Sequence, residues 1–251
     1  MTGYLFADCR FDLSDAGAGR SAYEAGHIPG AVFFDLDTDL SDRSIPPEQG
    51  GRHPLPDARA FARRAGELGV AAGRLVVAYD QGMAGASARL AWMLRALGHA
   101  DVAVLERGVA GWWGPLRSGA EPAPAGSFTA TAWPAAAVIS TDELRERLGD
   151  PRLAVLDARA PERYRGDVEP LDPVAGHIPG AINAPFTETE LPDGVLDEAE
   201  IVVYCGSGVS ACVVLARLAA AGRPDARLYP GSWSEWSRRG LPVSTGDADS
   251  R

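Results

Sequence analysis

The chain has 251 residues, enough for two medium domains or one large one, and 46% of them are hydrophobic, so a core can form without metals or disulfides. Its 24 Lys and Arg residues face 34 Asp and Glu residues, and the net charge of -10 argues against nonspecific binding to nucleic acid or to an anionic membrane surface. A small anionic substrate is still possible, because a local site can be positive in an acidic protein.

The cysteine count and the apolar runs bear on the compartment. An odd, small number of cysteines (Cys9, Cys205 and Cys212) fits a reducing compartment and not a disulfide framework. Residues 1–10 show no basic segment followed by an apolar run, and the chain has no run of about 18 apolar residues. We therefore expect a cytoplasmic protein with no membrane partner.

The first half alternates strand-like and helical patterns. A Gly-His-Ile-Pro-Gly-Ala segment occupies residues 26–31, and a polar stretch dense in Asp, Pro and Gly covers residues 35–56. Residues 57–68 form an amphipathic helical pattern. Residues 75–79 read as a strand that ends at Asp80, and the alanine-rich residues 85–98 as a helix.

The second half begins after a segment rich in Pro, Ala, Gly and Thr, and we expect a domain at residues 1–122, a linker at 123–137 and a second domain at 138–251. Thr141 or Asp142 is the expected cap of a helix, and residues 152–157 are an expected strand. A strand at 201–204 then leads into Cys205, and an apolar helix follows at 209–222.

An internal repeat organises the chain. The segment at residues 26–31 recurs at 176–181, and Asp80 stands in the first half where Cys205 stands in the second. Trp113 likewise mirrors Trp236. The pattern predicts two tandem α/β units, each a mainly parallel sheet with helices on both faces. Only the second unit has a thiol at this position, so we expect the first to be non-catalytic.

The loop after Cys205 is suited to a sulfur nucleophile. Glycines let the backbone curl so that N–H groups point at one spot, and the following helix adds its partial positive charge there. The Cys205 thiol should therefore ionise more readily than a free cysteine. The loop residues expected to bind substrate are Gly206, Gly208, Val209, Ser210 and Ala211. The alternative is an inert core cysteine. A phosphatase is disfavoured, because Ala211 stands where such loops carry an arginine.

Taken together, these segments resemble the two-domain rhodanese family of sulfurtransferases. The resemblance rests on the two repeated turns, the Cys205 loop, residues 157–159 with 163–164, and the Gly-Ser-Trp-Ser-Glu-Trp segment at 231–236. It implies two tandem rhodanese-like domains, with Cys205 accepting a sulfane sulfur as a persulfide and passing it to a thiol or cyanide.

The resemblance also suggests the donor and further site residues. The Cys-Gly-Ser-Gly-Val loop is similar to that of the 3-mercaptopyruvate sulfurtransferases, whereas thiosulfate-preferring members carry basic residues after the cysteine. It implies a relay of Ser207, His53 and Asp37 and a carboxylate-binding role for Arg163. Residues 168–173 lack the second arginine of such members, so either Arg165 compensates or the donor differs.

Other residues receive structural or supporting roles. His27 and His177 lack ligand partners at metal spacing, and we expect them to tie turns together, with no metal and no cofactor. Trp236 should lie in the core and Trp233 should line the pocket. The expected partners are a small anionic sulfur donor and a thiol acceptor, such as a thioredoxin-like protein or a low-molecular-weight thiol. A thiosulfate:cyanide sulfurtransferase and a persulfide carrier with little turnover remain alternatives.

Overall fold

The computed structural model describes residues 3–82 and 85–247 and divides into two compact units. Unit 1 comprises Met1–Asp42 and Leu55–Trp133, and unit 2 comprises Arg43–Pro54 and Pro134–Arg251. The segment Arg43–Pro54 therefore belongs with the second unit, although it lies well inside the first half of the sequence.

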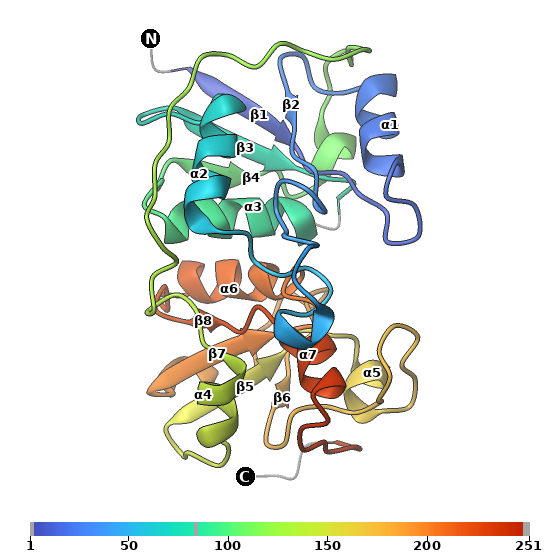
Figure 1. The fold of residues 1–251 in the computed structure, drawn as a ribbon, viewed down its shortest axis with the longest axis vertical. Coiled ribbons are helices and arrows are strands. Elements are labelled where there is room, and N and C mark those ends of the chain that lie inside the picture. Colours follow the sequence, from blue (N-terminus) through green and yellow to red (C-terminus); the bar gives the residue numbers. More distant parts are fainter. Residues whose placement is uncertain (1–2, 83–84, 248–251) are drawn as a thin grey trace. The chain divides into compact units, whose positions relative to one another are not determined.

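Unit 1 is built on a four-stranded sheet in which each pair of neighbouring strands is parallel, in the order β2-β1-β3-β4 (Figure 1). Its strands are β1 (Tyr4–Asp8), β2 (Val32–Phe33), β3 (Leu75–Tyr79) and β4 (Val102–Val104). Its helices are α1 (Ala18–Ala25), α2 (Ala58–Glu67), α3 (Gly85–Ala96) and the 3-10 turn η2 (Gly108–Gly111). Strand β3 has the predicted bounds, and α2 begins where the Asp57 carboxylate accepts the N–H groups of Arg59 and Ala60. Between the expected strand and the expected helix at 85–98, residues 83–84 lie outside the described residues.

Unit 2 repeats this topology, with a parallel sheet in the order β6-β5-β7-β8. Its strands are β5 (Leu153–Asp157), β6 (Ile182–Asn183), β7 (Glu200–Tyr204) and β8 (Arg227–Leu228). Its helical elements are η1 (Pro47–Gln49), α4 (Thr141–Glu146), α5 (Pro161–Arg165), η3 (Val195–Asp197), α6 (Ala211–Ala220) and α7 (Ser232–Arg238). The prediction of two tandem α/β units with parallel sheets and flanking helices is confirmed.

The start of α4 differs from its prediction by one residue. The hydroxyl of Ser140, and not Thr141 or Asp142, accepts the N–H of Glu143 and caps the helix. Thr141 is buried instead, and its hydroxyl donates a hydrogen bond to Glu235.

The two histidines of the repeated turns are structural, as predicted. In unit 2, Nδ1 of His177 lies 2.8 Å from the carbonyl oxygen of Tyr164, and the two rings stack with their centroids 3.9 Å apart. In unit 1, Nδ1 of His27 lies 2.8 Å from the carbonyl oxygen of Tyr23, and those rings also stack. Each turn is thus tied to the helix that precedes it.

The repeated tryptophans do not share one environment. Trp236 is fully buried in the core of unit 2, as predicted, and its indole N–H donates to the carbonyl of Pro242. Trp113 is 93% exposed, so the expected equivalence with Trp236 is wrong. Trp112 packs against the core of unit 1 in its place.

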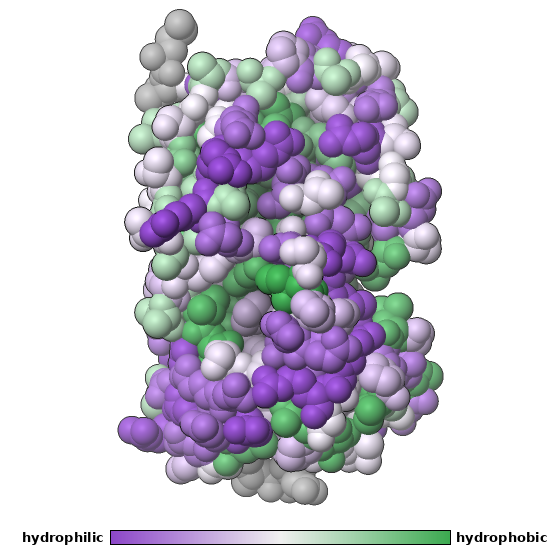
Figure 2. All heavy atoms as spheres, viewed as in Figure 1, coloured by the Kyte–Doolittle hydropathy of each residue, from purple (hydrophilic) through white to green (hydrophobic). Residues whose placement is uncertain are grey.

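The surface is hydrophilic over one part of unit 2. Figure 2 shows hydrophilic side chains gathered over the end of unit 2 that carries α4. Within the described residues, no helix has the length and apolar character needed to cross a membrane. Nor do those residues contain a group of three His, Cys, Asp or Glu side chains able to hold a metal ion.

Candidate active site

Cys205 lies in the turn between β7 and α6, the position that the strand-loop-helix pattern predicts. Its Sγ accepts the backbone N–H of Gly208 at 3.1 Å, so one amide of the loop points at the sulfur. Gly208 adopts a φ of +74°, a left-handed conformation that favours glycine. The cysteine itself is only 1% exposed. The sulfur is therefore held beneath its own loop.

The start of α7 holds the backbone of Cys205 through two hydrogen bonds. The Cys205 N–H donates to Oγ of Ser232 at 3.2 Å, and the Cys205 carbonyl accepts the N–H of Trp233 at 2.9 Å. Both main-chain polar groups of Cys205 are thus bonded to the start of one helix, which fixes the position of its backbone.

A histidine from the segment Arg43–Pro54 reaches the same loop. Nδ1 of His53 lies 2.8 Å from Oγ of Ser207, and the two residues are 3% and 6% exposed. Gly51 permits this approach, because a Cβ built on it would lie 2.3 Å from the carbonyl oxygen of Gly231. The tight packing of this segment against α7 therefore brings His53 to Ser207.

Two guanidinium groups converge on Gly206. A Cβ built on Gly206 would lie 2.8 Å from Nη2 of Arg52, and 3.4 Å and 3.6 Å from Nη1 and Nη2 of Arg163. Among the described residues, neither Arg52 Nη2 nor Arg163 Nη1 has a hydrogen-bond acceptor. Two guanidinium nitrogens thus lie close to the residue that follows Cys205, an arrangement able to bind an anion.

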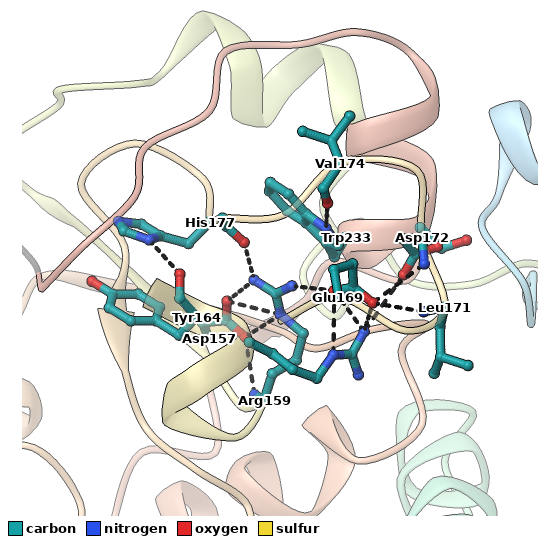
Figure 3. Close-up of polar contacts among 12 residues, drawn as sticks. Asp157, Arg159, Tyr164, Glu169, Leu171, Asp172, Val174, His177 and Trp233 are labelled. Atoms are coloured by element: carbon teal, nitrogen blue, oxygen red, sulfur yellow. Dashed lines mark hydrogen bonds and ion pairs between the residues drawn. The ribbon is translucent and has the colours of Figure 1, made fainter. Parts of the chain in front are cut away.

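These arginines belong to a larger group, which we call the arginine cluster: Arg52, Arg159, Arg163, Arg238, Asp157, Glu169 and Asp172. Glu169 accepts hydrogen bonds from Arg163 (2.7 Å) and from Arg159 (3.2 Å) (Figure 3). Asp172 accepts hydrogen bonds from Arg52 and Arg238. The carboxylates hold the guanidinium groups in place.

Trp233 packs against Arg159 of the arginine cluster. It is fully buried, its indole N–H donates to the carbonyl of Val174 at 2.8 Å, and the guanidinium of Arg159 stacks 4.6 Å from its ring (Figure 3). In this position Trp233 supports Arg159, and its expected pocket-lining role stays a prediction.

The remaining expected residues lie in different surroundings. Val209, Ser210 and Ala211 form the approach to and start of α6, where Ser210 makes no side-chain cap. Arg165 pairs with Asp167 at 2.9 Å on the surface, and this does not favour its use as a second substrate arginine. Asp37 lies in a turn of unit 1, where its N–H donates to Asp35, so its pairing with His53 stays a prediction.

The equivalent position of unit 1 is filled by a carboxylate. Oδ1 of Asp80 accepts the N–H of Gly82 at 2.9 Å, and Oδ2 accepts the hydroxyl of Ser87 at 2.9 Å. The turn after β3 thus bonds an oxygen anion that belongs to its own chain.

Sequence reasoning missed Arg52, Glu169, Asp172 and Arg238. Arg52 directly precedes His53, and this adjacency is the one sequence signal that could have pointed to it. Glu169 and Asp172 lie in a segment whose sequence shows only that it lacks an arginine.

Comparisons with known proteins show what this chain is similar to. A family model described as a rhodanese-like domain matches residues 2–114 and again 140–239. A probable 3-mercaptopyruvate sulfurtransferase of Pseudomonas aeruginosa is 44% identical over 97% of this chain and 93% of its own length. The human 3-mercaptopyruvate sulfurtransferase is 41% identical over 89% of this chain and 81% of its own. A putative thiosulfate sulfurtransferase, SseB, of Mycobacterium tuberculosis is 40% identical over 96% of this chain and 90% of its own.

One solved structure is similar to this chain over most of its length. The crystal structure of SseA from Escherichia coli, described as a 3-mercaptopyruvate sulfotransferase, superposes with a TM-score of 0.77 at 36% identity. The superposition covers 92% of this chain and 93% of that one.

Proposed function

The chain belongs to the rhodanese family of sulfurtransferases, and on this premise we propose that it takes a sulfane sulfur from 3-mercaptopyruvate, carries it as a persulfide on Cys205 and passes it to a thiol or to cyanide. The family model covers both units, and relatives with this donor in their names are similar over nearly the whole chain. The arrangement around Cys205 supports the choice of donor.

The donor is anchored through its carboxylate. Arg163, which the sequence resemblance selects, and Arg52, which it does not, each direct an η nitrogen at Gly206. Two guanidinium groups can share one carboxylate, and they would place the thiol carbon of the donor beside Cys205.

In the first step, the Cys205 thiolate attacks the sulfur of the donor. A bond forms between the two sulfur atoms, and the bond between the donor's sulfur and its C3 carbon breaks. The electron pair of that bond moves onto the carbon, giving the enolate of pyruvate. The proton of the donor's thiol ends on C3, so the products are the Cys205 persulfide anion and pyruvate. The amide of Gly208 supports the negative sulfur.

The observation that carries this choice is the hydrogen bond between Ser207 and His53, at 2.8 Å beside the nucleophile. A carbon leaving group needs a proton, whereas the sulfite that leaves thiosulfate does not. A hydroxyl bonded to an imidazole can accept the thiol proton and return it to carbon. Asp37 would complete this relay by orienting His53.

In the second step, the thiolate of an acceptor attacks the outer sulfur of the persulfide. A bond forms between the acceptor sulfur and the outer sulfur, the bond between the outer sulfur and Cys205 breaks, and Cys205 is released as a thiolate. A low-molecular-weight thiol or a thioredoxin-like protein is the acceptor we propose. Cys9, Cys205 and Cys212 form no disulfide, and this suits a reducing compartment such as the cytoplasm, where such thiols are abundant.

The test is sulfide release from 3-mercaptopyruvate in the presence of a thiol. The Cys205→Ser variant should release none, and the parent protein incubated with donor alone should gain the mass of one sulfur atom at Cys205. The matched control is Cys212→Ala, because Cys212 is buried in α6 and its thiol donates to the Gly208 carbonyl at 3.5 Å. Turnover by Cys205→Ser at the parent's rate would exclude the proposal.

Thiosulfate is the second candidate donor, because one relative is named a putative thiosulfate sulfurtransferase. Steady-state rates with both donors and the same acceptor decide between them. A protein that forms the persulfide but turns over neither donor with free small thiols would be a persulfide carrier.

A further inference from the structure

The segment between α5 and the turn at His177 contributes two buried carboxylates to the arginine cluster. The side chains of Glu169 and Asp172 are 3% and 0% exposed. The N–H groups of Leu171 and Asp172 both donate to Oε1 of Glu169, so the segment folds around this carboxylate (Figure 3). Buried carboxylates in such a position stay charged only when paired, and here each is paired with arginines.

The two carboxylates act on the same arginines that face Gly206. Asp172 accepts a hydrogen bond from Nη1 of Arg52 and lies 3.6 Å from Nη2 of Arg163. Glu169 binds Nε and Nη2 of Arg163. Nη1 of Arg52 and both Nε and Nη2 of Arg163 therefore bind protein carboxylates, while Nη2 of Arg52 and Nη1 of Arg163 lie near Gly206.

The charge of the cluster follows from its members. Four guanidinium groups stand against three carboxylates, so the formal charge of the cluster is +1. Without Glu169 and Asp172 it would be +3. A charge of +1 balances one carboxylate of a ligand, whereas a second negative charge on the ligand would face Glu169 and Asp172 without compensation.

We propose that Glu169 and Asp172 are specificity-determining residues that select a singly charged donor over a doubly charged one. This inference rests on the proposed function, because it assigns a charge preference to the same site. It gives the segment at 168–173 a role: the segment lacks a second arginine, Arg52 supplies the second guanidinium, and the acidic residues limit the net charge.

The first experiment compares donors in charge-neutralised variants. Asp172→Asn and Glu169→Gln keep the shape and an acceptor oxygen but raise the cluster charge by one. We expect the ratio of kcat/KM for thiosulfate to kcat/KM for 3-mercaptopyruvate, each with cyanide as acceptor, to rise about tenfold in each variant. The matched control is Asp167→Asn, which removes the same charge from an exposed residue of the same segment and should leave the ratio unchanged. An unchanged ratio in both folded variants would overturn the proposal.

The second experiment uses only the parent protein and measures ligand binding without turnover. Pyruvate and oxalate have similar size, but pyruvate carries one negative charge and oxalate two. Calorimetry on the parent protein should show pyruvate binding more tightly than oxalate, and oxalate binding as tightly as pyruvate, or more so, would overturn the charge argument. Because this binding does not depend on sulfur transfer, a parent protein that fails to turn over 3-mercaptopyruvate would exclude the proposed function and still leave this test decisive.

Discussion

Ser207 and His53 are joined by a 2.8 Å hydrogen bond although 154 positions separate them in the chain. The bond exists because the segment Arg43–Pro54 belongs to unit 2, where Gly51 packs against the carbonyl of Gly231. A relay at this site therefore depends on a short piece of chain that reaches the catalytic unit from within the first half of the sequence.

The Ser207–His53 bond predicts a loss of activity specific to the carbon leaving group. Ser207→Ala should lower kcat with 3-mercaptopyruvate by about a hundredfold, and His53→Asn by a similar factor, because the enolate loses its proton source. The double variant should cost little more than either single one, since the two residues act as a unit. Thiosulfate turnover is the internal control, and an equal loss with both donors would argue against a proton relay.

The two guanidinium groups predict effects on donor binding. Arg52→Lys and Arg163→Lys should each raise KM for 3-mercaptopyruvate about tenfold, because an ammonium group cannot reproduce a bidentate contact. Arg165→Lys is the control, since Arg165 pairs with Asp167 at the surface. A KM that changes for Arg165→Lys but not for Arg52→Lys would contradict the assignment.

The space around Gly206 is limited, and we expect a side chain at this position to displace the nearby guanidinium groups. In Gly206→Ala the new methyl group would lie 2.8 Å from Nη2 of Arg52, so the guanidinium must move and we expect KM for the donor to rise about tenfold. Gly17→Ala is a suitable comparison, because its nearest neighbour would be the Asp15 carboxylate at 3.4 Å. Unaltered kinetics in Gly206→Ala would show that the guanidinium positions are not critical.

The burial of His177 leads us to expect that the free energy of unfolding depends on pH. Burial lowers the pKa of His177 below its ordinary 6.5, so the folded state keeps the ring neutral while the unfolded state takes up a proton as the pH falls through 6.5. The unfolded state then binds more protons, and the free energy of unfolding decreases as the solution is acidified, by at most about 1.4 kcal/mol per pH unit.

Urea unfolding at about pH 7.5 and about pH 5.5 measures this effect. His177→Asn keeps an N–H donor for the Tyr164 carbonyl but cannot titrate, so its free energy of unfolding should change less between the two conditions. The same change in the parent and the variant would exclude His177 as a source of the pH dependence.

Much of the fold could be predicted from local pattern. The strand at residues 75–79 has the predicted bounds, and the strand before Cys205 differs by one residue, because buried parallel strands leave a continuous apolar run. The repeated turn segment identified two equivalent units, and their sheets have the same strand order. These features depend on residues close together in the sequence.

The composition of the arginine cluster could not be predicted in this way. Arg52 and Asp172 are 120 positions apart, and their pairing follows from the packing of Arg43–Pro54 within unit 2. The stacking of Arg159 on Trp233 joins residues 74 positions apart and could not be read from the local pattern either. A cap such as Ser140 also differs by one residue from its prediction, since serine, threonine and aspartate have similar preferences for that position.

Asp80 has a consequence for stoichiometry. Its carboxylate already receives the hydrogen bonds of Gly82 and Ser87, so the first copy of the fold holds a carboxylate of its own chain where the second copy has the sulfur of Cys205. Under the proposed function, one polypeptide with two copies of the same architecture would load a single sulfur atom per cycle, and the first copy would not compete for donor.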